Sequence, residues 1–588
     1  MILFIVLINK KLEWKYLLPD LAEFVSVFKQ SHLPLSASLV MLQTRLMDGL
    51  TQFCHCHSPS RFMLLKAQED EAYFQLIADM VKQILPEPSQ PFGSCYIITD
   101  IGVTLRPASS PEDNFAACSN SVWQIWVEYE QLFGALRFYR DVINLQSGLI
   151  HRANGGVLVL GAHALVSQPL LWLRLKQMVM QQRFDWLSAD EKRPLPIAVP
   201  SMPLDLRLIM VGDRESLASF NDLELGLTKL ALYGEFESDL RIDGTGQIVQ
   251  WCAWVSMLAE RQGLPQLDTT AWPALIKQSV RYSGDQYQLP LCPRWLMRRL
   301  KEAALYSGQQ VITAGALLDS DRTRIWHESY LSERMHEEIA EGQVMVETEG
   351  LVIGQVNALS VLDFPGHPLP FGEPLRISCV VHLGDGEIHD VDRKAELGGN
   401  IHAKSMMIMQ AFLMSALKLE QHFPFSASLV FEQSYGEVDG DSASLAELVA
   451  LISALAAKPV DQQIAVTGSV DQFGRVQPIG GVNEKIESFF ALCRTRGLTG
   501  MQGVIIPSTN MRHLCLNDEV IEAVRGGQFS LWPVATIDEA LTILTAMPFN
   551  HDKRPSLTAS IRERIANINN LHERQRLPWG FRWLNWFN

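Results

Sequence analysis

The chain has 588 residues, of which 47% are hydrophobic and 20% are charged, and its formal net charge at pH 7 is −15. This length is enough for about three to four domains, and the composition excludes a chain that is disordered throughout. The negative charge argues against general nucleic-acid binding, because that function needs a clustered positive face. No apolar run reaches the roughly 18 residues of a membrane-spanning helix.

Residues 1–12 are expected to form a short tail. Their apolar run, residues 1–8, is followed by Lys10 and Lys11. A signal peptide instead places its positive charge before a longer apolar stretch and ends in small residues. A weak membrane-contacting segment is the alternative for this tail.

Nine cysteines lie along the chain without the spacing of a disulfide framework. An odd number of cysteines in a large chain is typical of reduced thiols, so we expect a cytoplasmic protein. One cluster, Cys54-His55-Cys56-His57, could hold a metal, but structural zinc sites usually use two separated ligand pairs. We expect no metal there and favour a pair of buried thiols beside surface histidines.

Residues 13–269 alternate between apolar strands and helices. Strands are expected at 62–65, 156–160 and 206–211, and each is followed by helical periodicity. The helix after the first strand has its apolar positions at Phe74, Leu76, Ile77 and Met80. Strands that alternate with helices indicate a parallel sheet, so the predicted fold class is α/β.

The middle of the chain is predicted to be helical. Residues 270–319 have purely helical patterns and are expected to form a helical subdomain. A charged helical stretch at 332–341 lies within 320–345, which we expect to be a helical linker between the two halves of the chain.

Residues 346–548 are expected to form a compact α+β domain. Glycines and β-branched residues punctuate short strands at 351–361 and 376–382, and helical patterns return at 403–417 and 442–457. A further strand is expected at 463–470.

The stretch 437–447, EVDGDSASLAE, passes from a glycine-containing turn into a helix. Ser444 and Glu447 have the spacing of a capping box. Ser442 then lies at the mouth of the helix, where backbone amides near Ala443 have no partner within the helix and could stabilise an oxyanion. Alone, this pattern fits a simple helix cap at Ser442 better than a nucleophile.

Lys485 supplies the second half of a candidate catalytic pair. Gly480 and Gly481 open a helix in which Lys485 lies three residues after Val482 and four before Phe489, on the apolar stripe. A lysine there either extends along the surface or is removed from water. Desolvation lowers the pKa of the amine and makes it available as the base that a serine nucleophile needs.

Several motifs in order resemble the proteolytic domain of the Lon protease family, closest to its B-type branch. They cover about 346–548 and include IGQVNALSV, FGEP, GGNIHAKS, FEQSYGEVDGDSAS, AVTGSVDQFGRVQPIGGVNEKIE and GLTGMQGVIIPSTNMRHL. The resemblance implies that Ser442 is the nucleophile and Lys485 the general base, supported by Thr467. B-type members also carry acidic residues beside the serine, here Asp439 and Asp441, which could switch the site between resting and active arrangements.

Lon proteases usually couple this domain to an AAA+ ATPase, which residues 13–269 resemble in a degenerate form. No Gly-x-x-x-x-Gly-Lys-[Ser/Thr] motif occurs, and three acids, Glu69 to Glu71, follow the first strand where a glycine loop would hold phosphates. After the strand 156–160, Gly161 and Ala162 replace the acidic pair that would serve magnesium and water. We therefore expect a pseudo-ATPase that requires neither ATP nor Mg²⁺. The alternative is a half unrelated to ATPases.

The leading hypothesis is a serine endopeptidase that cleaves unfolded or flexible polypeptides without ATP hydrolysis of its own. The resemblance implies a homo-oligomeric ring, with a hexamer favoured. The competing hypothesis is a holdase or regulatory scaffold of the same fold that does not cleave. The retained serine, lysine and threonine argue against it.

The expected C-terminal tail, 549–588, is basic and aromatic. It ends in WGFRWLNWF, which could bind an anionic membrane surface or a single strand of nucleic acid. We favour docking of these aromatic residues on the protein itself or on a neighbouring subunit, and we expect no nucleic-acid partner.

Overall fold

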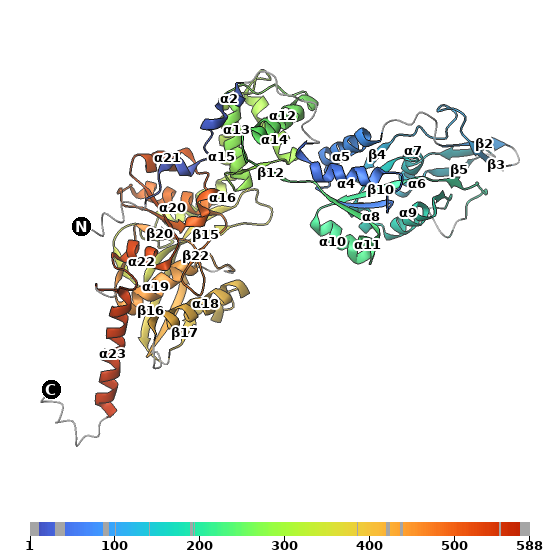
Figure 1. Cartoon of the computed structure of the whole chain (residues 1–588). Helices are drawn as coiled ribbons and strands as arrows, with labels where there is room; N and C mark the ends of the chain where they lie inside the picture. The colour runs from blue at the N-terminus through green and yellow to red at the C-terminus, as the bar shows by residue number, and fades with distance from the viewer. Residues whose placement is uncertain are drawn as a thin grey trace. The chain divides into compact units, whose positions relative to one another are not determined.

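The computed structural model (Figure 1) describes residues 11–29, 41–85, 93–99, 102–139, 142–188, 192, 194–384, 386–418, 424–434, 439–551 and 554–576. The chain divides into two compact units. The α/β unit comprises residues 26–269 and 289–313, and the C-terminal unit comprises residues 1–25, 270–288 and 314–588.

The α/β unit contains the predicted parallel sheet. Its five strands have the order β11-β1-β10-β7-β4, and every neighbouring pair is parallel. The strands are β1 (Phe62–Lys66), β4 (Ser121–Gln124), β7 (Val157–Gly161), β10 (Arg207–Gly212) and β11 (Leu232–Glu235). Every residue of β7 is buried, and so is every residue of β10 except the first, which is typical of a sheet covered on both faces.

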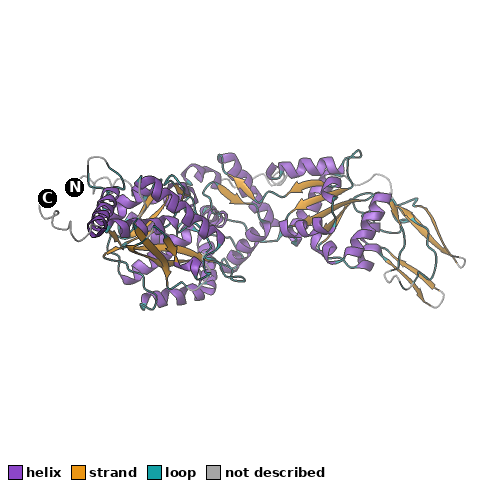
Figure 2. Ribbon diagram, turned by 90° about the horizontal axis from the view of Figure 1, so that it is seen from below, coloured by secondary structure: helices purple, strands orange, loops and turns teal. Residues whose placement is uncertain are grey.

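Helices flank this sheet (Figure 2). They include α4 (Thr44–Cys54), α5 (Glu71–Ile84), α8 (Ala162–Ser167), α9 (Pro169–Gln181) and α10 (Arg214–Leu223). Two further helices of this unit, α12 (Thr245–Arg261) and α14 (Pro293–Tyr306), pack on each other beside the sheet region. The amphipathic helix predicted after the first strand is α5, and Phe74, Ile77 and Met80 are fully buried in it. β4, β11 and two hairpins, β2–β3 (Ser94–Thr99, Gly102–Pro107) and β5–β6 (Ala135–Tyr139, Val142–Gln146), were not predicted.

The helical region expected at 270–319 does not form one compact subdomain. α13 (Ala271–Ser283) and α15 (Ala314–Glu328) belong to the C-terminal unit, α14 belongs to the α/β unit, and a short strand, β13 (Gln288–Pro290), interrupts the helices. The reason for the division lies in α13. Its Arg281 donates to Glu484 at 2.7 Å and to Glu487 at 2.8 and 2.9 Å, and both carboxylates belong to the C-terminal unit.

The C-terminal unit is built on a seven-stranded mixed sheet of order β17-β18-β16-β15-β20-β23-β24. Its strands are β15 (Gln355–Leu362), β16 (Phe371–Leu383), β17 (Ile388–Asp390), β18 (Phe425–Glu432), β20 (Ile464–Val466), β23 (Gly503–Pro507) and β24 (Ser530–Val534). β15 and β16 are antiparallel, and β15, β20, β23 and β24 run parallel. The fold class is therefore mixed α/β, as predicted.

Two strands predicted as continuous are interrupted. The strand expected at 351–361 consists of β14 (Leu351–Ile353) and β15, separated at Gly354, whose amide donates to Ser453 Oγ at 2.9 Å. The strand expected at 463–470 consists of β20 and β21 (Ser469–Val470), separated at Thr467 and Gly468. β21 pairs with β22 (Val476–Gln477).

Separate apolar clusters cover the two faces of this sheet. Successive residues of β20 alternate between them, since Val466 packs with α19 (Ser444–Ala456) and Ala465 packs with α20 (Val482–Arg496). Every residue of α19 is buried. α18 (Asn400–Leu417) and α22 (Ile537–Thr545) join the α19 side.

The linker expected at 320–345 packs on the C-terminal unit. It contains the end of α15 and α16 (Tyr330–Ala340), and Ile339 of α16 is buried with Val346 and with Leu492 of α20. Arg496 holds this segment by donating to the carbonyls of Ile339 and Val346.

Both ends of the described chain contribute to the C-terminal unit. Leu12, at the end of the expected N-terminal tail, is buried and its amide donates to the Leu531 carbonyl at 2.9 Å. Residues 1–10 lie outside the described residues. Within the expected C-terminal tail, α23 (Leu557–Arg576) packs Leu557, Ile561 and Ile565 into the apolar cluster of α19. These residues recur every fourth position, which makes one apolar face.

Arg564 of α23 also donates to the carbonyls of Ala454 and Leu455 at 2.8 and 2.7 Å, at the C-terminal end of α19. The start of the expected tail is therefore part of the folded unit, because its apolar face and this arginine both bind α19. The aromatic residues 579–587 lie outside the described residues.

Candidate functional site

Three elements of the C-terminal unit bring Ser442, Lys485 and Thr467 together. Ser442 lies two residues before α19, Lys485 lies in the first turn of α20, and Thr467 directly follows β20. The N-cap of α20 is Gly481, which has φ +64° and on which a Cβ would lie 2.5 Å from Val361 Cγ2. Glycine is required there because the left-handed backbone and the lack of space both oppose a side chain.

The geometry is that of a hydrogen-bonded triad. Lys485 Nζ donates to Ser442 Oγ at 2.9 Å and lies 3.3 Å from Thr467 Oγ1. The Ser442 carbonyl accepts from the Gly468 amide at 2.9 Å and from Thr467 Oγ1 at 3.3 Å. These contacts hold the serine from its backbone while its hydroxyl points to the amine.

Lys485 is removed from water, which is one of the two alternatives that its place on the apolar stripe left open. The residue is 2% exposed. Burial lowers the pKa of Lys485 to about 8, and the negative charges of Asp441 and Glu484 oppose a further fall. A substantial fraction of this amine is therefore neutral near physiological pH and can accept a proton.

The two acidic residues beside the serine have different partners. Asp441 Oδ2 accepts from Ser469 Oγ at 2.8 Å, and its charge acts on Lys485. Asp439 Oδ1 accepts from the Ile401 amide at 3.0 Å, in the first turn of α18. A Cβ on Gly399 would lie 2.3 Å from this carboxylate, so the α18 end fits closely against Asp439. Ser469 is a site residue that sequence reasoning missed, although it stands in the quoted TGSV motif.

The capping box predicted for Ser444 and Glu447 is not formed. The N-cap of α19 is Ala443, and Ser444 Oγ accepts from the Val470 amide at 3.0 Å. Glu447 is 2% exposed and lies 3.8 Å from His402. The prediction was wrong because a buried serine and a buried glutamate find partners in other elements.

Ala443, the residue expected to supply an oxyanion donor, follows Ser442 at the start of α19. Its backbone has φ −96° and ψ −8°, and its carbonyl already accepts from the Glu447 amide at 3.0 Å. The Ser444 amide is bonded to the Asp441 carbonyl at 3.1 Å.

In the α/β unit, a carboxylate lies where an AAA+ module holds the phosphates of ATP. Glu69 Oε1 accepts from the His163 amide at 2.9 Å, and a Cβ on Gly161 would lie 2.5 Å from Glu69 Oε2. This carboxylate thus lies at the carboxyl ends of β7 and β10, against Gly161 and Gly212, where phosphates would be held. Burial raises the pKa of Glu69, and the hydrogen bond from the His163 amide opposes that rise.

The neighbouring groups are engaged as well. Lys66, at the end of β1, donates to Glu235 Oε1 at 2.6 Å. Asp70 caps α5 by accepting from the Ala72 amide at 3.0 Å. A polyphosphate would meet one carboxylate at its centre and a lysine already paired, so the residues present do not suit it.

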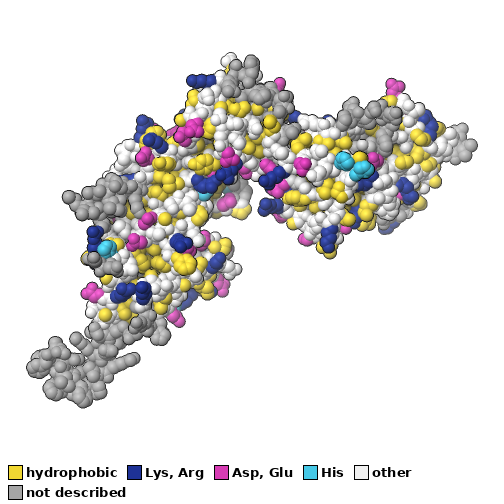
Figure 3. Space-filling model, in the orientation of Figure 1, with side chains coloured by type: hydrophobic (Ala, Val, Ile, Leu, Met, Phe, Trp, Pro, Cys, Tyr) yellow, Lys and Arg dark blue, Asp and Glu magenta, His cyan; other side chains and the backbone are white. Residues whose placement is uncertain are grey.

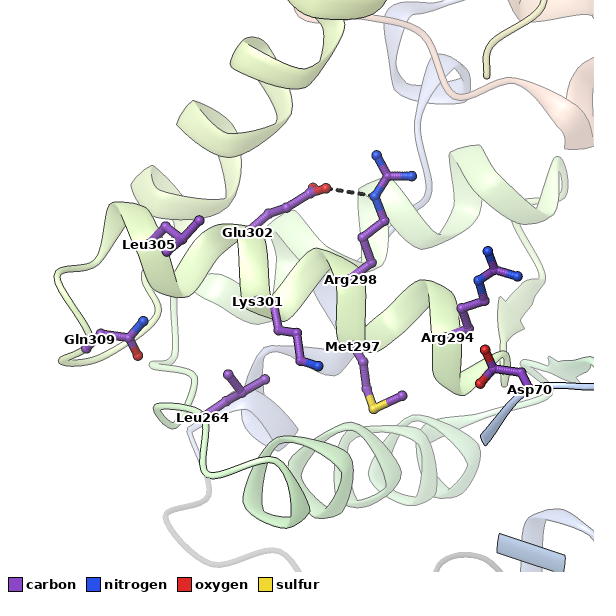
Figure 4. Close-up of a pocket in the computed structure, with 9 residues that line it drawn as sticks. All are labelled: Asp70, Leu264, Arg294, Met297, Arg298, Lys301, Glu302, Leu305 and Gln309. Carbon is purple, nitrogen blue, oxygen red and sulfur yellow. Dashed lines mark hydrogen bonds and ion pairs between the residues drawn. The ribbon is translucent and has the colours of Figure 1, made fainter. Parts of the chain in front are cut away.

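A pocket of about 480 Å³ lies beside Asp70 in the α/β unit (Figure 4). Its lining residues are Asp70, Leu264, Arg294, Met297, Arg298, Lys301, Glu302, Leu305 and Gln309. Arg298 is paired with Glu302 at 2.9 Å. None of the predicted catalytic residues lines this pocket.

The cluster at 54–57 is only partly as predicted. Cys54 is buried, whereas Cys56, His55 and His57 are exposed. The expected pair of buried thiols is thus one buried thiol, because Cys54 ends α4 while Cys56 lies in the turn that follows. Over the described ranges of the chain, no three His, Cys, Asp or Glu side chains converge as metal ligands.

Charge is mixed on the surface. On the face shown in Figure 3, Lys and Arg side chains lie among Asp and Glu side chains and do not gather into one basic field. Among the helices that the structure describes, none is both long enough and apolar enough to cross a membrane.

Two family models match the sequence. The Lon protease (S16) C-terminal proteolytic domain matches residues 428–546, which contain Ser442, Thr467 and Lys485. The LonB-like AAA domain matches residues 125–231.

Relatives match almost the whole chain. The "Putative Lon protease homolog" of Escherichia coli K12 is 52% identical over 582 residues, which cover 98% of this chain and 99% of that protein. The chain belongs to the Lon protease family. The protein of the same name from Haemophilus influenzae Rd is 40% identical over 573 residues, 95% of this chain and 94% of that protein.

An archaeal Lon protease, from Thermococcus kodakarensis, is 27% identical over 422 residues, 68% of this chain and 60% of that protein. Family membership confirms the resemblance that the motifs indicated. This Lon-family chain therefore joins an AAA-like α/β region to a Lon proteolytic domain.

Proposed function

We propose that this Lon-family protein is a serine endopeptidase that uses Ser442 and Lys485 and hydrolyses no ATP. The observation that carries the proposal is the 2.9 Å contact between Lys485 Nζ and Ser442 Oγ, with the lysine 2% exposed. A lysine in an apolar site has a physical use when its neutral amine must accept a proton.

The reaction follows the general scheme of acyl transfer. Neutral Lys485 takes the hydroxyl proton as Ser442 Oγ attacks the peptide carbonyl, and the ammonium then returns it to the leaving amine. Water, deprotonated by the same amine, hydrolyses the acyl-enzyme. We assign the oxyanion to the Ala443 amide, at the positive end of α19.

Thr467 and Asp441 tune the base. Thr467 Oγ1 bonds to both the Ser442 carbonyl and Lys485, so it keeps the amine directed at the serine. Asp441 keeps the lysine pKa from falling further, which preserves an ammonium that can protonate the leaving amine.

The α/β unit acts in this proposal as a scaffold for assembly and substrate reception, because Glu69 and the paired Lys66 oppose phosphate binding. Substrates are unfolded or flexible polypeptides. Family analogy supports a homo-oligomeric ring that restricts access, so short peptides would be cleaved faster than folded proteins.

The test is cleavage of casein and of a fluorogenic peptide, with and without ATP–Mg²⁺, by the native chain and by Ser442→Ala and Lys485→Ala variants. We expect equal native rates with and without nucleotide, and no cleavage by either variant. Absence of native cleavage under every condition would favour the holdase alternative. A rate that depends on ATP hydrolysis would contradict the pseudo-ATPase.

A further inference from the structure

Four ionisable side chains are buried together beside α19, away from the Ser442–Lys485 pair. They are His402 of α18, Asp390 at the end of β17, Asp392 of α17 (Val391–Lys394) and Glu447 of α19. Their exposed fractions are 0%, 8%, 4% and 2%, respectively. The proposed peptidase mechanism uses none of them.

His402 is at the centre of this cluster. Its Nε2 lies 2.9 Å from Asp390 Oδ2 and 3.8 Å from Glu447 Oε1. The Phe431 ring contacts the imidazole edge-on, with centroids 5.6 Å apart, and Asp392 Oδ2 accepts from the Phe431 amide at 2.9 Å. The imidazole is thus enclosed by α18, β17, β18 and α19.

The charges favour a protonated imidazole. Although burial opposes it, the close contact with the Asp390 carboxylate and the charges of Glu447, Asp390 and Asp392 raise the pKa of His402. Burial raises the pKa of Glu447 to about 7, and Asp390 and Asp392 add to that rise while His402 opposes it. A buried imidazolium between carboxylates is costly unless each member keeps its partners.

Among the described residues, no group of His, Cys, Asp and Glu side chains has the geometry to hold a metal ion, and this cluster is no exception. Its hydrogen bonding is also incomplete: among the described residues, both ring nitrogens of His402, Asp390 Oδ2 and Glu447 Oε2 have no hydrogen-bond partner, and the 2.9 Å contact between Nε2 and Asp390 Oδ2 is an ion pair. An apolar pair of similar size would fill the same space at lower cost. Charged groups buried at this cost indicate that they position the elements that carry them.

Both ends of the nucleophile segment, Asp439 to Ala443, attach to helices that the cluster joins. At one end, the Ile401 amide in the first turn of α18 donates to Asp439, one residue before His402. At the other end, Ala443 is the N-cap of α19, and Glu447 lies in the first turn of that helix. Contact between His402 and Glu447 therefore fixes the two anchor points of the segment relative to each other.

We propose that His402 and Glu447 are positioning residues, which clamp the first turns of α18 and α19 and so hold Ser442 Oγ within reach of Lys485. This inference rests on the proposed peptidase function. The clamp acts through the backbone of residues 439–443 and touches no substrate. Loss of the clamp lets the serine shift while the substrate-binding surface stays in place.

The test compares His402→Gln and Glu447→Gln, which remove charge at nearly constant volume, with Ser453→Ala. Ser453 is a buried residue at the far end of α19, where its Oγ bonds Gly354 and Lys458, so its loss should destabilise α19 without loosening residues 439–443. We expect each clamp variant to lower kcat on a fluorogenic peptide by roughly 10- to 100-fold with KM nearly unchanged, because small displacements of reacting groups have effects of that size. Ser453→Ala should leave kcat unchanged.

A second measurement does not depend on activity. In the Ser442→Ala background, hydrogen exchange of residues 439–443 should become faster with His402→Gln or Glu447→Gln and stay unchanged with Ser453→Ala. Asp390→Asn, which keeps its shape, tests the same clamp if a glutamine variant fails to fold, and faster exchange is again expected.

Two outcomes separate this inference from the proposed function. If the native chain cleaves but the clamp variants keep native kcat and exchange, the clamp is overturned and the peptidase stands. If the native chain cleaves nothing, the peptidase falls, and unchanged exchange at 439–443 overturns the clamp as well.

Discussion

At the residue scale, the chemistry depends on how far burial lowers the pKa of one lysine. Lys485 is buried, and the charges of Asp441 and Glu484 oppose the fall in its pKa that burial causes. The balance leaves its pKa at about 8. The base is therefore active on the alkaline side of that value and protonated on the acid side.

The pH dependence of kcat/KM follows from this balance. We expect the rate to rise with pH and to level off above a midpoint near pH 8, as the neutral amine forms. Asp441→Asn removes a charge that stabilises the ammonium, so the midpoint should move to lower pH. Asp439→Asn is the matched control, because Asp439 bonds to Ile401 and should leave the midpoint unchanged. An equal shift in both variants would contradict the role given to Asp441.

The burial of Lys485 should also affect the free energy of unfolding of the chain. In the folded chain its pKa is about 8, against 10.5 unperturbed, so at pH 7 the buried ammonium costs roughly 3 kcal/mol. Lys485→Met should therefore stabilise the chain at pH 7, less whatever the lost hydrogen bonds contribute. The difference should shrink as pH rises from 8 to 10.5, because the native lysine loses its charge there. Denaturant unfolding at several pH values measures this, and a pH-independent difference would contradict it.

Sequence reasoning found Ser442 and Lys485 because each stands in a motif and Lys485 also interrupts an apolar stripe. It misassigned Glu447, since a Ser-x-x-Glu spacing describes a capping box and a buried pair equally well. His402 stands in the quoted GGNIHAKS motif, but a histidine in a helix gives no sign of its partners. Asp390 is 12 residues away and Glu447 is 45 residues away, and only the folded sheet brings them together.

At the scale of elements, α19 directly follows Ser442, the proposed nucleophile, and packs against several other elements. β15 and β16 lie on one side, α18 and α22 pack alongside it, and α23 contacts its C-terminal half. The last of these contacts was not foreseen, because the basic composition of residues 549–588 suggested a tail. Its apolar residues at every fourth position are the signal that was available.

α23 should therefore contribute to the stability of the C-terminal unit. Ile561 is fully buried in the apolar cluster of α19. Ile561→Ala should lower the free energy of unfolding by about 2–4 kcal/mol, since it leaves a cavity. Glu563→Ala, on the exposed face of the same helix, should change it by less than about 0.5 kcal/mol. Chemical denaturation measures both, and equal effects would mean that α23 does not belong to the core.

Element prediction succeeded where the period was long and failed where strands were short. The helices α5, α18 and α20 matched their apolar periodicity. β4 and β11, with four residues each, were missed, since so short a run has no readable period. The strand breaks at Gly354 and Gly468 were not predicted for a different reason. Hydrogen bonds to other elements interrupt those strands, and the local sequence does not show them.

At the scale of the whole molecule, two compact units share one chain that crosses between them more than once. Helical periodicity predicted the helices of residues 270–319 but not their division, which depends on ion pairs such as Arg281 with Glu484 and Glu487. The local sequence pattern of a helix does not show which residues, distant along the chain, its charged side chains will pair with.

ATP–Mg²⁺ should not bind the α/β unit and should not change the thermal stability of the chain. A ligand that binds the folded state raises the melting temperature, so millimolar ATP–Mg²⁺ should leave the melting temperature of the native chain unchanged. Calorimetric titration should likewise show no binding heat. A clear rise in melting temperature that Glu69→Ala enlarges would show that phosphates enter the place where Glu69 lies, and would contradict the pseudo-ATPase.

The most direct test of the central claim is to observe the acyl-enzyme itself. The nucleotide-free chain is mixed with an activated acyl ester, and the mass of the intact protein is followed over time. We expect one acyl group, mapped to Ser442, with no labelling of Ser442→Ala and strongly slowed labelling of Lys485→Met. Labelling at another residue, or an equal rate in Lys485→Met, would contradict the assignment of Ser442 as nucleophile and Lys485 as its base.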